Sequence, residues 1–220
     1  MKYVLLLIAL ASTLCFNLRS TKQNYDAYVM AVQWPNGFCS ASNCGGRDSV
    51  VDRNAMTIHG LWPSLKNGNR LNECTSGKKI IDNSSSLFQS MRTNWPSLTS
   101  TKNVDFWGHE YNKHGYCMVE EYGWSGYERY FQFVIDLHNR SYKNIIKNAF
   151  SSYSYSATSV KVTYDKMKEA LRRVMPNATI NMKCSSGYIS ELYFYLDKNY
   201  SPCPSCKFSN QCGSGTLVFK

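Results

Sequence analysis

Segments near both ends of the chain have the hydrophobic pattern of β-strands. Between Tyr25 and Trp34 bulky side chains recur at every second position, the period of a strand, and Pro35 ends the run. Shorter apolar runs predict further strands at residues 55–59, 180–184, 189–196 and 216–219.

Helical periodicity dominates the middle of the chain. Leu87, Met91 and Trp95 lie on one helical stripe, which Pro96 ends. Residues 104–114 are predicted to form a helix that Gly115 stops, because glycine readily adopts the left-handed conformation found at helix ends.

Three more helices are predicted after Trp124. Ser125 and Glu128 have the spacing of a capping box, and an apolar stripe follows them. The next helices cover residues 142–150 and 164–174, with Val174 on the inward face of the last, while 151–159 is a loop. Strands at both ends with helices between them predict an α+β fold, an antiparallel sheet packed against several helices.

The first twenty residues are predicted to be a secretory signal peptide. Lys2 precedes an apolar run from Val4 to Phe16, which is shorter than the roughly 20 residues needed to span a bilayer. An N-terminal anchor helix is the alternative. We expect residues 1–20 to be removed. Residues 21–220 would then form a single secreted domain that is not bound to a membrane.

Composition narrows the class of protein further. Of 220 residues, 43% are hydrophobic and only 18% are charged, which excludes a disordered, collagen-like or coiled-coil chain. The formal net charge is +10 and falls by two if Lys2 and Arg19 are removed. A basic globular protein often meets a polyanion.

The cysteines fit an oxidising compartment. Cys15 lies in the signal segment, and an even number remains, which points to disulfides whose pairing the spacing leaves open. These cysteines are Cys39, Cys44, Cys74, Cys117, Cys184, Cys203, Cys206 and Cys212. Zinc binding by Cys203 and Cys206 is the alternative, although no second cysteine pair has ligand spacing. Glycosylation is expected at the sequons of Asn83, Asn139, Asn177 and Asn199.

Histidines carry the chemical information. His138 lies in an ordinary amphipathic helix and is expected to be structural. His59 comes at the end of a predicted strand, before Gly60, which permits close approach of other groups, and near the flat face of Trp62.

A second cluster lies in residues 106–115. On a helix, Glu110 and His114 are neighbours, as are His109 and Lys113. His109 and His114 are five positions apart, about 140° around an α-helix, whereas a zinc-protease helix needs a spacing of four. No serine lies in a nucleophile elbow. With a zinc site and a serine nucleophile both disfavoured, these residues indicate acid–base chemistry near an anion, in which two imidazoles share the proton transfers.

RNA cleavage needs this set of groups. The 2′-hydroxyl of the substrate is the nucleophile, so the enzyme supplies a base, an acid and cations that stabilise charge on phosphorus. We expect no metal and no cofactor, and single-stranded RNA as the partner.

Two segments resemble the active-site motifs of the T2 ribonucleases. They are Thr57-Ile-His-Gly-Leu-Trp-Pro63 and Phe106-Trp-Gly-His-Glu-Tyr-Asn-Lys-His-Gly-Tyr-Cys117. The resemblance extends from Gln33-Trp-Pro35 to the C-terminal cysteines. It implies an α+β fold and an endoribonuclease that forms 2′,3′-cyclic phosphates and then, more slowly, 3′-phosphates.

The resemblance also implies roles for individual residues. His59 and His114 would be the catalytic pair, with His114 as base and His59 as acid. Glu110 and Lys113 would support the transition state, and His109 together with Lys113 would bind phosphate. Trp62 and Phe106 match positions that contact bases.

Cysteine positions resemble those of plant members. This implies the disulfides Cys39–Cys44, Cys74–Cys117 and Cys184–Cys212. The chain departs from several relatives by having Tyr195 where they have a cysteine, so Cys203 is expected to close on Cys206. Ser64 stands where other relatives carry Asp, which leaves the base preference open.

Within the family the chain resembles the plant S-ribonucleases, basic pistil glycoproteins that reject self pollen. Residues 143–183 hold eight Lys or Arg and two acidic residues, a stretch that could attract RNA or be an ordinary solvated face. Pollen-side recognition proteins would then be partners of a monomer. The alternatives are phosphate recovery or defence, and an inactive binding or storage glycoprotein.

Overall fold

The computed structural model describes residues 24–45, 51–69, 71, 74, 87–150, 160–208, 212 and 216–219. The predicted signal peptide, the loop at 151–159 and the Asn83 sequon lie outside the described residues. Within the described part of the chain, no helix is long and apolar enough to cross a membrane.

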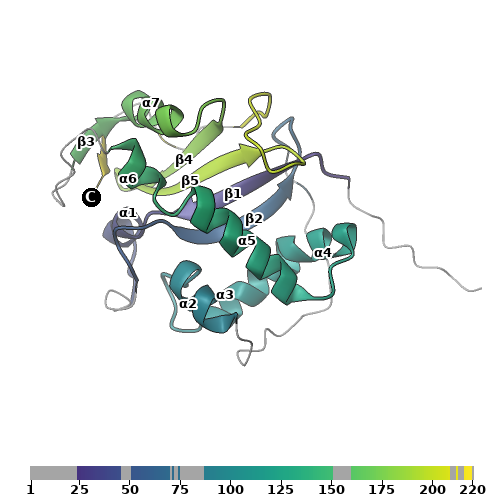
Figure 1. The fold of residues 1–220 in the computed structure, drawn as a ribbon. Helices are drawn as coiled ribbons and strands as arrows, with labels where there is room; N and C mark the ends of the chain where they lie inside the picture. Colours follow the sequence, from purple (N-terminus) through teal and green to yellow (C-terminus); the bar gives the residue numbers. More distant parts are fainter. Residues whose placement is uncertain are drawn as a thin grey trace, which may run out of the picture.

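A six-stranded sheet forms the centre of the fold (Figure 1). Its strands are β1 (Ala27–Gln33), β2 (Thr57–Ser64), β3 (Val160–Thr163), β4 (Thr179–Ser185), β5 (Tyr188–Leu196) and β6 (Thr216–Phe219). The order is β2-β1-β5-β6-β3, and β4 also pairs with β5. The α+β class and four of the five predicted strands are confirmed. The strand predicted to end at His59 is wrong at that end, because β2 continues to Ser64 in its pairing with β1, so His59 lies inside the strand. β3 was not predicted. One pair, β5 with β6, is parallel, so the sheet is not purely antiparallel.

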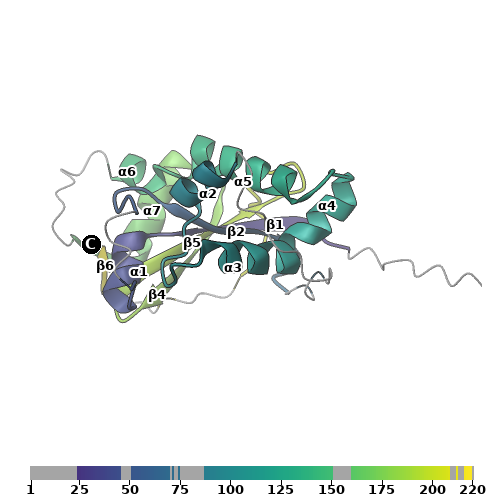
Figure 2. The ribbon, with the colours of Figure 1, turned by 90° about the horizontal axis from the view of Figure 1, so that it is seen from below.

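Helices gather beside the β2 edge and across one face of the sheet (Figures 1 and 2). They are α1 (Pro35–Ala41), α2 (Phe88–Asn94), α3 (Asn103–Glu110), α4 (Tyr116–Tyr122), α5 (Tyr127–Ser141), α6 (Ile145–Ala149) and α7 (Tyr164–Val174). A π-helical segment, η2 (Tyr111–Gly115), joins α3 to α4.

The expected stop at Gly115 is wrong. Gly115 has a helical φ of −66°, and the chain continues through η2 into α4. The small residue is needed for packing, because a Cβ there would meet the ring of Tyr130 at 2.7 Å. Gly123 is the residue that ends the helix, with a left-handed φ of 60°.

Three smaller expectations also need correction. The capping box does not form, because α5 begins at Tyr127 after Gly126 and has no side-chain cap. The helix predicted at residues 142–150 is shorter, since the amides of Tyr142 and Lys143 still bond to the last turn of α5. Val174 is 37% exposed rather than inward, because α7 ends at this residue.

Buried tryptophans connect the helices to the strand that carries His59. Trp95 is fully buried after α2, and its indole N–H donates to the backbone oxygen of His59 at 2.8 Å. Trp107 in α3 donates in turn to the backbone oxygen of Trp95 at 2.6 Å. The backbone at His59 is therefore fixed by the aromatic core.

Four disulfides link the described residues. They join Cys39 to Cys44, Cys74 to Cys117, Cys184 to Cys212, and Cys203 to Cys206. The pairings implied by the resemblance are confirmed. The zinc alternative at Cys203 and Cys206 is wrong, because both sulfurs are used in the disulfide.

Candidate active site

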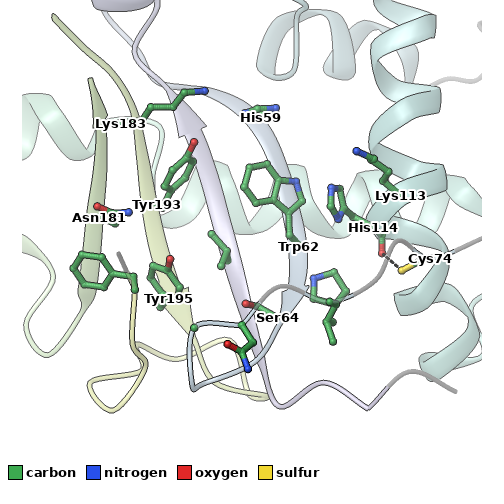
Figure 3. Close-up of a pocket in the computed structure, with 16 residues that line it drawn as sticks. His59, Trp62, Ser64, Cys74, Lys113, His114, Asn181, Lys183, Tyr193 and Tyr195 are labelled. Atoms are coloured by element: carbon green, nitrogen blue, oxygen red, sulfur yellow. Dashed lines mark hydrogen bonds between the residues drawn. The ribbon is translucent and has the colours of Figure 1, made fainter. Parts of the chain in front are cut away.

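A pocket of about 580 Å³ opens on the sheet and holds both predicted catalytic histidines (Figure 3). His59 and Trp62 come from β2, and Lys113 and His114 come from η2. The indole of Trp62 contacts both imidazoles, with ring centroids 5.0 Å from His59 and 5.3 Å from His114. Two motifs about fifty residues apart therefore meet in one pocket.

Small residues on β1 and β2 leave room for this pocket. In the sheet register, Val29 lies between Trp62 and Tyr195, and Ala31 lies between Gly60 and Tyr193. Side chains on one face of a strand alternate, so the small residues form a low floor between bulky neighbours.

Gly60 permits the closest contact in the site. A Cβ at this position would overlap the Oε2 atom of Glu110 and the indole nitrogen of Trp62. Those two atoms are themselves hydrogen-bonded, because the Trp62 N–H donates to Glu110 at 2.8 Å. The close approach expected at Gly60 is therefore made by protein side chains.

Glu110 is 2% exposed and lies beneath the imidazole of His59. Its Oε1 atom is 3.7 Å from Nε2 of His59. Burial raises the pKa of the Glu110 carboxyl, which His59 and the Trp62 hydrogen bond partly offset.

Glu191 on β5 is a site residue that the sequence analysis missed. It is 1% exposed, and its Oε2 atom lies 2.7 Å from Nδ1 of His59. The same carboxylate accepts hydrogen bonds from Tyr193 at 3.2 Å and from Lys183 at 2.9 Å. The contacts with His59 and Lys183 lower the pKa of Glu191 to about 2 despite its burial, so the carboxylate is ionised at neutral pH. The sequence did contain one sign of this role, because Glu191 is a charged residue inside the apolar run of β5.

The two histidines have opposite electrostatic environments. Burial alone would lower the pKa of His59, but the hydrogen bond to Glu191 and the nearby charges of Glu110 and Glu191 raise it above 6.5. Burial lowers the pKa of His114 to about 3, and the charges of Lys113, His109 and His59 act in the same direction. His59 therefore holds its proton to a higher pH than an ordinary histidine does, whereas His114 is neutral near neutral pH.

The π-helical segment changes the spacing used in the sequence analysis. An α-helix of 3.6 residues per turn does not describe residues 111–115, so the 140° separation of His109 and His114 does not hold there. The two side chains nevertheless differ in placement, because His114 lines the pocket and the exposed His109 does not. Within the described residues, no three His, Cys, Asp or Glu side chains gather as a metal site.

Other predicted residues divide between the pocket and its surroundings. Lys113 lines the pocket, and the ring of Phe106 lies 5.7 Å from that of His59 without lining it. His138 is fully buried in α5, away from the pocket lining. The pocket can thus accept one proton and give another beside an anionic group.

This fold and pocket define a disulfide-linked α+β protein with an acid–base site. The model of the Ribonuclease T2 family matches residues 25–206. Ribonuclease Rh of Rhizopus niveus is 35% identical over 193 residues, which cover 78% of this chain and 73% of that enzyme. Ribonuclease S-2 of Antirrhinum hispanicum is 27% identical over 209 residues, which cover 91% and 84%.

A solved structure agrees with the match in sequence. RNase NT in complex with 5′-AMP has a TM-score of 0.69 and 27% identity, covering 89% of this chain and 98% of that chain. The chain belongs to the Ribonuclease T2 family and is an endoribonuclease of that family. The S-type relative is no more similar than the Rhizopus enzyme, so these identities do not select the S-type subgroup.

Proposed function

We propose that the protein is a secreted endoribonuclease that cleaves single-stranded RNA with two histidines and without a metal. The observation that supports this proposal most strongly is that one pocket holds the imidazoles of His59 and His114, whose pKa values are shifted in opposite directions. Groups in such a pair are suited to act as acid and base near the same pH.

His114 is the base in the first step. Its neutral ring removes the proton of the 2′-hydroxyl as that oxygen attacks phosphorus. His59 gives the proton on Nε2 to the 5′-oxygen as the bond from phosphorus to that oxygen breaks. The products are a 2′,3′-cyclic phosphate and a 5′-hydroxyl. In the slower step the histidines exchange roles: His59 takes a proton from the water that attacks phosphorus, and His114 gives one to the 2′-oxygen as its bond to phosphorus breaks, which leaves a 3′-phosphate and a 2′-hydroxyl.

Positive charge in the pocket supports the transition state. Lys113 lines the pocket beside His114, and we assign it to the phosphate oxygens. His109, which was also expected to bind phosphate, is exposed and does not line the pocket, so we do not assign it to the reacting phosphate. Glu110 orients the indole of Trp62, which offers a flat surface to a base, and Phe106 is assigned to the base on the other side.

Product analysis tests this proposal. An oligonucleotide with a single ribose is incubated with the protein in the presence of EDTA, and an all-deoxy oligonucleotide is the matched control. We expect cleavage only after the ribose, with a cyclic phosphate appearing before the 3′-phosphate. A requirement for divalent metal, or cleavage of the all-deoxy strand, would contradict the proposal.

Glu191→Gln is expected to move the alkaline limb of the pH–rate profile to lower pH. The carboxylate raises the pKa of His59, so the neutral amide lets His59 lose its proton earlier as pH rises. The measurement is kcat/KM against pH, with Glu121→Gln as control because that carboxylate pairs with the distant Lys198. An alkaline limb that stays in place in Glu191→Gln would show that the carboxylate does not tune His59.

Secretion and glycosylation are part of the same proposal. Four disulfides fit an oxidising compartment. Asn139, Asn177 and Asn199 are exposed, as acceptors of N-glycans must be.

A role in pollen rejection is the second candidate, supported by the basic stretch at residues 143–183. A basic ribonuclease holds phosphates more strongly, but charge alone does not define a biological role. Expression restricted to pistil tissue would support this candidate. Induction by phosphate starvation would instead favour phosphate recovery.

A further inference from the structure

The wall of the pocket opposite His114 carries aromatic side chains that none of the proposed catalytic steps uses. Tyr195 on β5 and Phe208 both line the pocket, and their rings stack at 5.6 Å with an interplanar angle of 26°. Figure 3 shows Trp62 between His114 and the tyrosines of β5. We call Tyr195 and Phe208 the aromatic wall.

The aromatic wall is accessible. Tyr195 and Phe208 are partly exposed, whereas core aromatic residues such as Phe194 on the same strand are fully buried. The low floor at Val29 separates Tyr195 from Trp62 in the sheet register. The wall is thus a partly exposed surface that lines the pocket next to the assigned base-binding indole.

The charge of the lining favours an anionic occupant. Lys113, Lys183 and the protonated form of His59 supply positive charge to the lining, which contains no Asp or Glu among the described residues, and Lys183 is paired with the buried Glu191 at 2.9 Å. Lys168 also lies 5.9 Å from the ring of Phe208. Aromatic rings together with cations are the combination that holds single-stranded nucleic acid, since bases stack and phosphates pair.

We propose that the aromatic wall binds a third base of single-stranded RNA, next to the nucleotide that stacks on Trp62. This inference rests on the proposed function, because the two bases flanking the cleaved phosphate are assigned to Trp62 and Phe106. The wall then favours substrates longer than a dinucleotide. Tyr195 contributes its ring at a position where the resemblance led us to expect a cysteine in relatives.

The test compares a dinucleotide with two trinucleotides, extended at the 5′ or the 3′ end. Each substrate keeps one 2′-hydroxyl, so only one linkage is cleaved. We expect one extension to raise kcat/KM of the parent protein by about 5- to 150-fold, the effect that stacking of one base gives. The double variant Tyr195→Leu with Phe208→Leu should lose this gain and keep its rate on the dinucleotide.

Two controls separate stacking from general damage. Tyr195→Phe keeps the ring and should keep the gain, and Phe133→Leu removes an aromatic ring that packs against Tyr200 instead. The proposal is overturned if the double variant keeps the gain, if it slows both substrates equally, or if neither extension helps the parent protein. A parent protein that cleaves none of the substrates contradicts the proposed function instead.

A second measurement detects stacking directly. A trinucleotide without 2′-hydroxyls carries 2-aminopurine at the extended end and is titrated with the parent protein and with the double variant. Stacking on the wall is expected to quench its fluorescence in the parent protein and much less in the double variant. Equal quenching by the two proteins would overturn the third-base site.

Discussion

Changing His59 or His114 to Asn is expected to slow RNA cleavage by about 10²- to 10⁴-fold, the contribution of a positioned acid or base. Asparagine keeps a polar side chain but cannot exchange a proton near neutral pH. Both rings contact Trp62 and line one pocket, so loss of either leaves one proton transfer without its group. The measurement is the initial rate on an RNA oligonucleotide, with circular dichroism to confirm folding.

The double variant provides the internal control. If the two imidazoles act as one unit, removing both should cost little more than removing one, because the first loss already disables the pair. Multiplicative losses would indicate independent contributions. Activity equal to that of the parent protein in either single variant would remove that histidine from the mechanism.

Acidification is expected to destabilise the fold through His138. This residue is fully buried in α5, and burial together with the charge of Lys143 lowers its pKa to about 3. In the unfolded chain its pKa is about 6.5, so between these values the unfolded state binds more protons. The free energy of unfolding therefore falls as pH drops from 6.5 to 3, by up to about 5 kcal/mol from this group.

The substitution His138→Leu removes the titrating imidazole and replaces it with an apolar side chain that can fill the same place in the core. The variant is expected to show a shallower loss of stability between pH 6.5 and 3, measured by urea unfolding at several pH values. His109→Gln is the matched control, because His109 is exposed on α3 whereas His138 is fully buried. An unchanged slope in His138→Leu would show that the buried ring is not what limits stability in acid.

Residues within the two contiguous motifs could be predicted from the sequence. His59, Trp62 and His114 lie in segments whose composition already indicates acid–base chemistry, and the pocket brings them together. Glu191 could not be found in this way, because it is 132 positions from His59 and its strand reads as an apolar run. Only the sheet register places it under the imidazole.

Local backbone geometry is the second feature that could not be predicted from the sequence. Hydrophobic periodicity identifies a helix through residues 104–114, but the change from an α-helical to a π-helical turn alters the count by a single residue. The packing of Gly115 against Tyr130, which involves two separate helices, is likewise invisible in either segment alone. The aromatic wall could not be predicted either, because Tyr195 and Phe208 come together only in the folded chain.

The pH dependence of kcat/KM on a dinucleotide, measured in EDTA, tests the division of roles most directly. A base with a pKa of about 3 and an acid with a pKa above 6.5 predict a bell-shaped profile. Activity should fall below about pH 3 as His114 gains a proton, and fall again on the alkaline side, where His59, whose pKa is raised, loses one. Circular dichroism at each pH separates the acid limb from unfolding. A profile without an alkaline limb, in a protein that stays folded, would contradict the assignment of His59 as the acid.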